Sequence, residues 1–301
     1  MTITYATIFD DIIKDLDSFF LEGYSSNITT NYKVQGKFIA RAKGSGKERE
    51  LQMPGFTAHA EIKDLKSLIV AHFIAGHEIA HLINDHNKPY PRSDADIVAS
   101  EKWADYFGAR LTFTVLILGK LSNDQLRSYA GPFARANAVP FNMWSQLLLE
   151  GAREAIDFFY HQFPIKATKH HAGACFRVQS IVTGILTFFK RYFGYMDKEI
   201  TLQVLDILLL SQNWFKQNSL EFTEQNVEDG QFRHIGVVHE RIQEDNNEIT
   251  AGMRPDIERL IGTSYNFSPE AFQKRRESIA ENFDRWGDNF GNSAAKFARS
   301  L

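Results

Sequence analysis

The apolar residues at the start of the chain recur with a helical period. Between residues 6 and 22 they fall three or four positions apart, and charged residues fill the other faces. The apolar positions are Ile8, Ile12, Ile13, Leu16, Phe19 and Phe20. This spacing predicts an amphipathic helix that packs on a core.

The pattern changes between residues 31 and 60, where two short runs of apolar residues flank Gly44-Ser45-Gly46-Lys47. Two strands joined by a hairpin turn fit this pattern best. A phosphate-binding loop fits less well, because the glycine spacing of that motif is missing and no helix clearly follows.

A broad apolar surface predicts a buried helix from about Asp64 to Asp85. Gly76 lies inside it, and glycine costs about 1 kcal/mol relative to alanine in a helix interior. We therefore expect close packing against another element at Gly76. Proline residues 89 and 91 keep the next segment extended. Ser93-Asp94-Ala95-Asp96 then has the capping-box pattern that begins a new helix.

Helical spacing continues from residue 123 to the end of the chain. The segments that show it lie near 140–162, 170–194, 198–216, 236–262 and 269–299. We predict a mainly α fold with a small β element. Its expected divisions are an N-terminal helix and β-hairpin (1–60), a core (61–195) and a C-terminal helical region (196–301), or one continuous domain (1–301).

Composition narrows the class of protein. An apolar content of 44% and an aromatic content of 13% are typical of a globular chain. A net charge of −3 gives no reason to expect nucleic acid or an anionic membrane as a partner. The single cysteine, Cys175, excludes an internal disulfide. The start of the chain lacks a signal-peptide pattern, and no apolar run approaches the ~20 residues of a membrane span. We therefore expect a soluble, cytoplasmic protein.

The motif with the clearest chemistry is His77-Glu78-Ile79-Ala80-His81. Histidines four apart leave the same face of a helix, as two nitrogen ligands of a tetrahedral zinc ion must. Glu78 lies about 100° further round the helix. It is therefore placed to take a proton from an attacking water and not to be a third ligand. The alternative is a chance match on an ordinary amphipathic helix.

A catalytic zinc site needs a third protein ligand, and the chain offers Glu101. Nineteen residues separate it from His81, enough for a loop and a returning helix. Asp105 lies one turn beyond Glu101 and could accept the spare N–H of a ligand histidine. A solvated acidic face is the alternative. Three aromatic residues on the same helix argue against it, namely Trp103, Tyr106 and Phe107.

Together, His77-Glu78-x-x-His81 and Glu101-x-x-Ala104-Asp105 resemble the gluzincin zinc metallopeptidases, in the Glu-x-x-Ala-Asp form of the M48-like peptidases. The resemblance covers residues 77–105. It implies a zincin-like metallopeptidase fold with additional C-terminal helices, in a soluble member of the group. It also implies one Zn²⁺ per chain on His77, His81 and Glu101, with Glu78 as the general base and Asp105 supporting a ligand histidine.

A third element begins at His171 and ends at Arg177. It is similar to the His-Pro-x-x-x-x-Arg element of M48-like enzymes, with Ala172 in place of the proline. We expect His171 to stabilise the transition state, with His170 as the alternative, and Arg177 to support the substrate or the structure. The other histidines lack a partner at ligand spacing and are expected to be structural or exposed: His59, His72, His86, His161, His234 and His239.

These features predict a zinc-dependent endopeptidase that acts on a protein or peptide. A strand within residues 48–58 could align the substrate by β-addition. One alternative is a catalytically inactive binding or regulatory protein on a zincin fold. The other is an all-helical interaction protein without a metal. No motif indicates an oligomeric state.

Overall fold

A computed structural model of the chain describes residues 2–129, 141–164, 173–194, 196–210, 212–215, 231–242 and 252–262, with a few isolated positions beyond. The chain divides into two compact units, Met1–Gly262 and Thr263–Leu301. The helix predicted at 269–299 lies largely outside the described residues, and the domain boundaries expected after residues 60 and 195 stay predictions.

The first helix, α1 (Tyr5–Asp17), begins with a capping box in which Thr4 and Thr7 exchange hydrogen bonds. The helix prediction is confirmed, but α1 ends before residue 22. The Asp17 carboxylate accepts hydrogen bonds from the N–H and hydroxyl of Ser26, at 2.8 and 2.6 Å, and so closes the loop that leads to the sheet. Phe19 is buried in this loop.

Three strands form the small sheet in the described residues: β1 (Ile28–Val34), β2 (Arg41–Lys43) and β3 (Arg49–Pro54). Their order is β1-β3-β2. The predicted hairpin is confirmed, because β2 and β3 are antiparallel. Gly44 has a φ of +79° in its turn, and a Cβ there would lie 1.7 Å from the Glu48 carbonyl oxygen, so only glycine fits. The pairing of β1 parallel to β3 was not predicted.

A short helix, α2 (Gly55–Ala58), leads to the central helix α3 (Leu65–Ile83). The Asp64 side chain caps α3 by accepting from the N–H of Ser67 at 2.7 Å. The predicted buried helix is confirmed, because α3 is buried on most of its faces. The next helix, α4 (Asp94–Leu118), starts with the predicted capping box of Ser93 and Asp96.

Helices α3 and α4 cross at two glycines. A Cβ on Gly76 would lie 2.6 Å from the Gly108 carbonyl oxygen, and one on Gly108 would lie 2.7 Å from the backbone nitrogen of His77. Beside this contact, the hydroxyl of Thr112 donates to the carbonyl of His72 at 3.1 Å. The close packing expected at Gly76 is confirmed. It also fixes the distance between the two helices that carry the candidate ligands.

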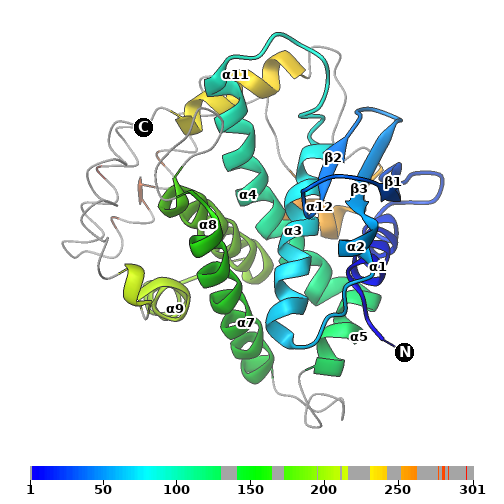
Figure 1. Cartoon of the computed structure of the whole chain (residues 1–301). Helices are drawn as coiled ribbons and strands as arrows, with labels where there is room; N and C mark the ends of the chain where they lie inside the picture. The colour runs from blue at the N-terminus through cyan, green and yellow to red at the C-terminus, as the bar shows by residue number, and fades with distance from the viewer. Residues whose placement is uncertain are drawn as a thin grey trace. The chain divides into compact units, whose positions relative to one another are not determined.

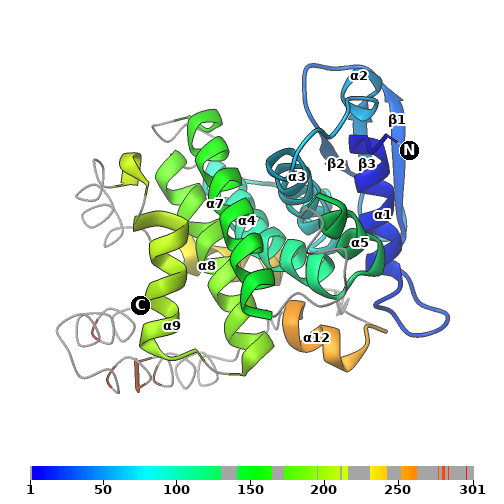
Figure 2. The ribbon, with the colours of Figure 1, turned by 90° about the horizontal axis from the view of Figure 1, so that it is seen from below.

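The remaining described elements are α5 (Lys120–Tyr129), α7 (Phe141–Gln162), α8 (Ala174–Phe193), α9 (Lys198–Leu205), the π-helical turn η1 (Asp206–Leu210), α11 (Gln231–Ile242) and α12 (Pro255–Ile261). The sheet and α1 lie on one side of α3, and α7 and α8 lie on the other (Figures 1 and 2). The prediction of a mainly α chain with a small β element is confirmed. The segment predicted near 236–262 is two helices, and Pro255 starts the second.

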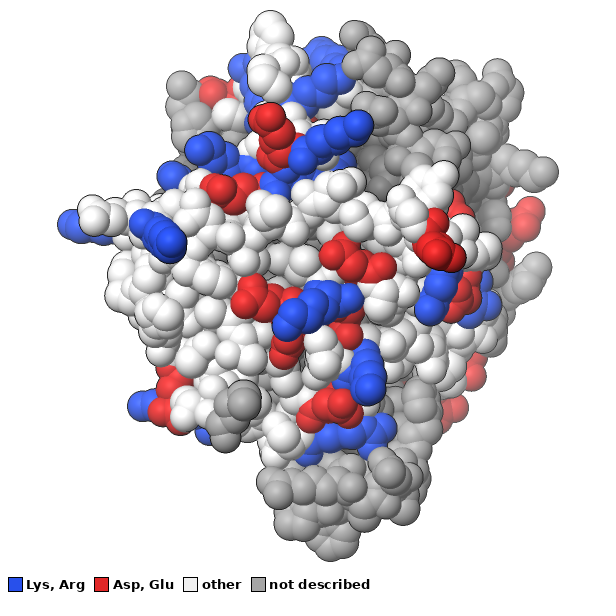
Figure 3. Space-filling view, turned by 90° about the vertical axis from the view of Figure 1, so that its right-hand side faces the viewer, with Lys and Arg blue, Asp and Glu red and all other residues white. Residues whose placement is uncertain are grey.

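The surface beside α1 and the sheet carries acidic and basic side chains interspersed with uncharged ones (Figure 3). No helix among the described residues is long and apolar enough to cross a membrane.

Candidate metal centre

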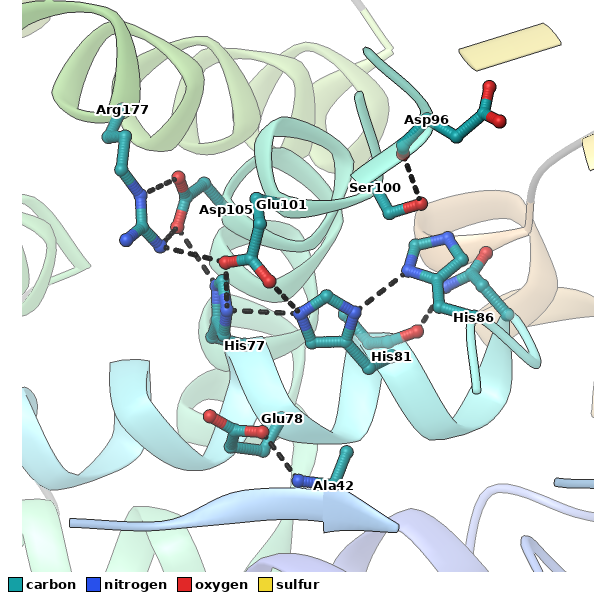
Figure 4. A network of polar contacts seen from close by, with 12 residues as sticks. Ala42, His77, Glu78, His81, His86, Asp96, Ser100, Glu101, Asp105 and Arg177 are labelled. Carbon is teal, nitrogen blue, oxygen red and sulfur yellow. Dashed lines mark hydrogen bonds and ion pairs between the residues drawn. The ribbon is translucent and has the colours of Figure 1, made fainter. Parts of the chain in front are cut away.

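Three predicted ligands converge in the structure. His77 and His81 come from α3 and Glu101 comes from α4 (Figure 4). The two Nε2 atoms are 3.1 Å apart; that of His77 lies 3.4 Å from Oε2 of Glu101, and that of His81 lies 3.4 Å from Oε1. Tetrahedral zinc with bonds of about 2.0–2.1 Å places its ligand atoms roughly 3.3 Å apart. The three side chains therefore lie close enough together to hold one metal ion, with each residue offering one ligand atom within 4.8 Å of the others.

The backbone explains why these side chains meet. His77 and His81 are one helical turn apart, with their ring centroids at 4.8 Å. His77 directly follows Gly76, at the point where α4 touches α3. Glu101 lies two turns before Gly108 along α4. The crossing of the helices thus brings the carboxylate opposite the two imidazoles.

Asp105 holds the other nitrogen of His77, with a distance of 2.9 Å from Nδ1 to Oδ1. A hydrogen on Nδ1 leaves the Nε2 lone pair for the ligand triangle, which consists of Nε2 of His77, Nε2 of His81 and the Glu101 carboxylate. Burial lowers the pKa of His77, but the hydrogen bonds and charges of Asp105 and Glu101 outweigh it and raise the pKa to about 10. Asp105 lies where the sequence pattern expected a partner of a ligand histidine.

Arg177 of α8 binds the Asp105 carboxylate in a bidentate arrangement. Its Nε and one terminal nitrogen donate to the two oxygens of Asp105, at 2.7 and 2.8 Å. The guanidinium lies 4.0 Å from the ring centre of Phe163 and 3.6 Å from Glu101. Burial raises the pKa of Asp105, but Arg177 and His77 outweigh it and hold the pKa below its usual value. Arg177 therefore supports Asp105 and, through it, His77.

Glu101 is held in its ionised form by its surroundings. Burial alone would raise the pKa of this carboxyl, but the charges and hydrogen bonds of His81 and His77 hold it well below its usual value. Metal ligands must be deprotonated to bind, so an ionised carboxylate suits the expected role.

Glu78 leaves α3 on the side of the sheet. Its Oε2 accepts the backbone N–H of Ala42 at 2.6 Å (Figure 4). Burial raises the pKa of Glu78, and His77 and His81 oppose that shift. The sequence placed Glu78 beside the two histidines. Its partner was not foreseen, because a backbone N–H has no signature in a sequence.

His81 has a partner that sequence reasoning missed. Its Nδ1 lies 2.9 Å from Nδ1 of His86, just beyond the end of α3. Nε2 of His86 lies 3.0 Å from Nε2 of His239, which α11 supplies. Burial, His81 and His239 hold the pKa of His86 well below its usual value, and burial lowers the pKa of His239 to about 3. Both rings are therefore neutral near pH 7.

The spacing of His81 and His86 was visible in the sequence, but they are five residues apart across a helix end. No helical rule pairs such positions.

His72 is buried as expected, with its Nδ1 2.9 Å from the Leu68 carbonyl oxygen, and burial lowers its pKa to about 4. The predicted catalytic His171 and its alternative His170 lie outside the described residues.

The centre opens into a cavity of about 590 Å³. Residues 39–42, which include most of β2, line one side of it. Part of its apolar lining comes from α3, from the C-terminal end of α7 and from the residue just beyond it: Phe73, Ile74, Phe158, Phe159 and Phe163. The arrangement therefore combines a metal-sized polar cluster, a carboxylate beside it and space for an apolar side chain.

No protein-family profile, curated protein or solved structure matches the chain.

Proposed function

We propose that the protein is a zinc-dependent endopeptidase of the gluzincin type. The observation that carries the proposal is the convergence of His77, His81 and Glu101, with 3.1 Å between the two Nε2 atoms and 3.4 Å from each of them to a separate oxygen of Glu101. Two imidazoles and one carboxylate are the donor set of many catalytic zinc sites, which keep a further position open. The resemblance of the motifs at residues 77–105 to M48-like peptidases supports the same assignment.

His77, His81 and Glu101 would hold the ion. A zinc ion there would polarise the scissile carbonyl and lower the pKa of the attacking water. Glu78 takes the proton from that water and passes it to the leaving amine. A carboxylate whose pKa is raised by burial takes up a proton more readily than an exposed one.

The substrate backbone can lie along β2. The strand within residues 48–58 cannot take it, because β3 already pairs with β1 and β2 on its two sides. On its other side β2 pairs with no strand in the part of the chain that the structure describes. The N–H and C=O of one strand residue point the same way. Since the Ala42 N–H reaches Glu78, the Ala42 carbonyl also faces the cavity and can accept a substrate N–H.

The test measures zinc and cleavage together. Purified protein should hold about one zinc per chain and should cleave a mixed peptide library. The Glu78→Gln variant should keep zinc and fold but lose at least ~10²–10⁴-fold in rate. Glu199→Gln, which changes an exposed carboxylate of α9, is the matched control.

Three outcomes would contradict the proposal in different ways. Protein without zinc would favour an interaction protein that needs no metal. Zinc without cleavage would favour an inactive binding protein on the same fold. Equal rates for wild type and Glu78→Gln, with zinc bound, would reject Glu78 as the base.

A further inference from the structure

Three buried imidazoles form a line that leads away from the ligand triangle. The nitrogen–nitrogen distances are 2.9 Å from His81 to His86 and 3.0 Å from His86 to His239. The side chains of His86 and His239 are 1% and 0% exposed. Their ring planes are nearly parallel, with an interplanar angle of 13°, and Trp103 meets the ring of His239 edge-on. The line is thus enclosed by protein on several sides.

The hydrogens along this line can be assigned by counting. A neutral imidazole has one N–H donor and one lone-pair acceptor. If Nε2 of His81 offers its lone pair to the ligand triangle, its hydrogen is on Nδ1 and donates to Nδ1 of His86. His86 then carries its hydrogen on Nε2 and donates to Nε2 of His239. Only one tautomer of each ring satisfies both short contacts.

The last ring of the line is held in place by the packing of α11. Asp96 accepts from His234 at 2.5 Å and from Arg241 at 3.3 Å, which ties both ends of α11 to α4. Lys88, in the segment after α3, donates to the Ile242 carbonyl at 2.9 Å. The apolar side of the helix is buried against α4 through a small cluster: Ala99, Ile235, Val238 and Ile242. These contacts fix where His239 lies.

We propose that His86 and His239 are positioning residues of the metal centre, which fix the tautomer and orientation of His81 as an Nε2 ligand and make α11 part of the centre. The inference rests on the proposed function in one respect, that His81 binds the metal. It adds that the two ligand histidines are held differently. His77 is held by a charged carboxylate that Arg177 supports, and His81 is held by a neutral relay.

The closest substitutions separate the relay from mere packing. Asparagine places its side-chain oxygen near the Nδ1 position of histidine, and glutamine places its own near the Nε2 position. His86→Asn therefore keeps an acceptor for His81, and His239→Gln keeps an acceptor for His86. The leucine variants at both positions keep bulk and remove the acceptor.

The first measurement is the dissociation constant for Zn²⁺, by competition with a chromogenic chelator. His86→Leu should weaken zinc binding by roughly 10–100-fold, the usual effect of losing an outer partner of a ligand histidine. His86→Asn should restore most of that loss. His239→Leu should weaken binding less than His86→Leu, and His239→Gln should restore it. Zinc binding by His86→Leu that equals wild type would overturn the proposal.

The second measurement is the ¹⁵N spectrum of selectively labelled histidines in the zinc-loaded protein. Nδ1 of His86 should have the shift of an acceptor nitrogen, and Nε2 of His86 that of an N–H. A hydrogen on Nδ1 of His86 would overturn the relay, whatever the affinities. This readout also guards against leucine variants that fail to fold, because it needs only the wild type.

The relay and the proposed function fail in distinguishable ways. Tight zinc binding that is insensitive to all four variants, in a protein that cleaves peptides, rejects the relay alone. The expected affinities and spectrum in a protein that cleaves nothing reject the peptidase function alone. Wild type that binds no zinc rejects both.

Discussion

Replacing Gly108 by alanine tests whether the helix crossing sets the geometry of the metal centre. The added Cβ would lie 2.7 Å from the backbone nitrogen of His77 and 2.8 Å from the carbonyl atoms of Gly76. All of these are backbone atoms, so no side chain can swing away. Non-bonded carbon contacts are comfortable at about 3.5 Å or more. Helices α3 and α4 must therefore separate locally by about 0.8 Å.

That separation should affect zinc binding more strongly than it affects the stability of the fold. A metal site tolerates deviations of about ±0.2 Å in its metal–ligand distances, so a separation of about 0.8 Å between the two helices beside His77 exceeds what the site tolerates. We expect zinc binding to weaken by roughly 10–100-fold, as when a support of a ligand is lost. Overpacking by the new methyl group should lower the free energy of unfolding by about 1–3 kcal/mol. The higher helix propensity of alanine relative to glycine should offset about 1 kcal/mol of that loss.

Zinc competition and thermal unfolding of the zinc-free protein measure the two effects separately. Gly236→Ala is the matched control, because Gly236 lies within α11 and a Cβ there meets nothing within 4 Å. It should raise stability by up to about 1 kcal/mol and leave zinc affinity unchanged. Gly108→Ala that binds zinc as tightly as wild type would refute the claim that this crossing sets the ligand distances.

Three further predictions concern the same centre. Asp105→Ala should weaken zinc binding by roughly 10–100-fold in equilibrium dialysis, and unchanged binding would mean that Asp105 does not support His77. Because the pKa of His77 is about 10, this ring is protonated at pH 7 in the zinc-free protein, so zinc must displace its proton. Zinc affinity should then rise as the pH is raised from about 6 to about 8, below the pH at which free zinc hydrolyses. Calorimetry in two buffers of different ionisation enthalpy should detect proton release, and a release of zero would contradict this. Because Ile74 and Phe159 line the cavity, an apolar substrate side chain should bind there. Peptides with leucine beside the scissile bond should therefore have a kcat/KM roughly 10–200-fold higher than peptides with alanine there. Equal values of kcat/KM would show that the apolar lining does not bind a substrate side chain.

The features that the sequence predicted correctly are those that depend on local structure. Capping residues and apolar periodicity marked the starts of α3 and α4, and the glycines at 44 and 46 marked the β2–β3 turn. The one-turn spacing of His77 and His81 placed both side chains on one face of α3, and Glu101 of α4 lies opposite them. Each of these features depends on residues within a few turns of one another, or on two helices joined by a short loop.

The sequence could not predict contacts that depend on distant backbone. At the end of α1, Asp17 accepts a hydrogen bond from the backbone N–H of Ser26, a contact that apolar periodicity does not reveal. The parallel pairing of β1 with β3 depends on the path of the intervening chain. The contact of His86 with His239 joins positions 153 apart, and only the docking of α11 creates it.

The separation of His86 and His239 also bears on how the protein is made. Closing a loop of 153 residues costs about 4.5 kcal/mol of chain entropy, which the contacts of α11 must exceed. At synthesis rates of about 5–20 residues per second, α11 follows the ligand helices by on the order of 10 s. During that interval a nascent chain has its three ligands and His86 but lacks His239. Zinc should therefore be held less tightly until α11 docks, so that a chain would reach its full zinc affinity only after residue 242 has emerged from the ribosome.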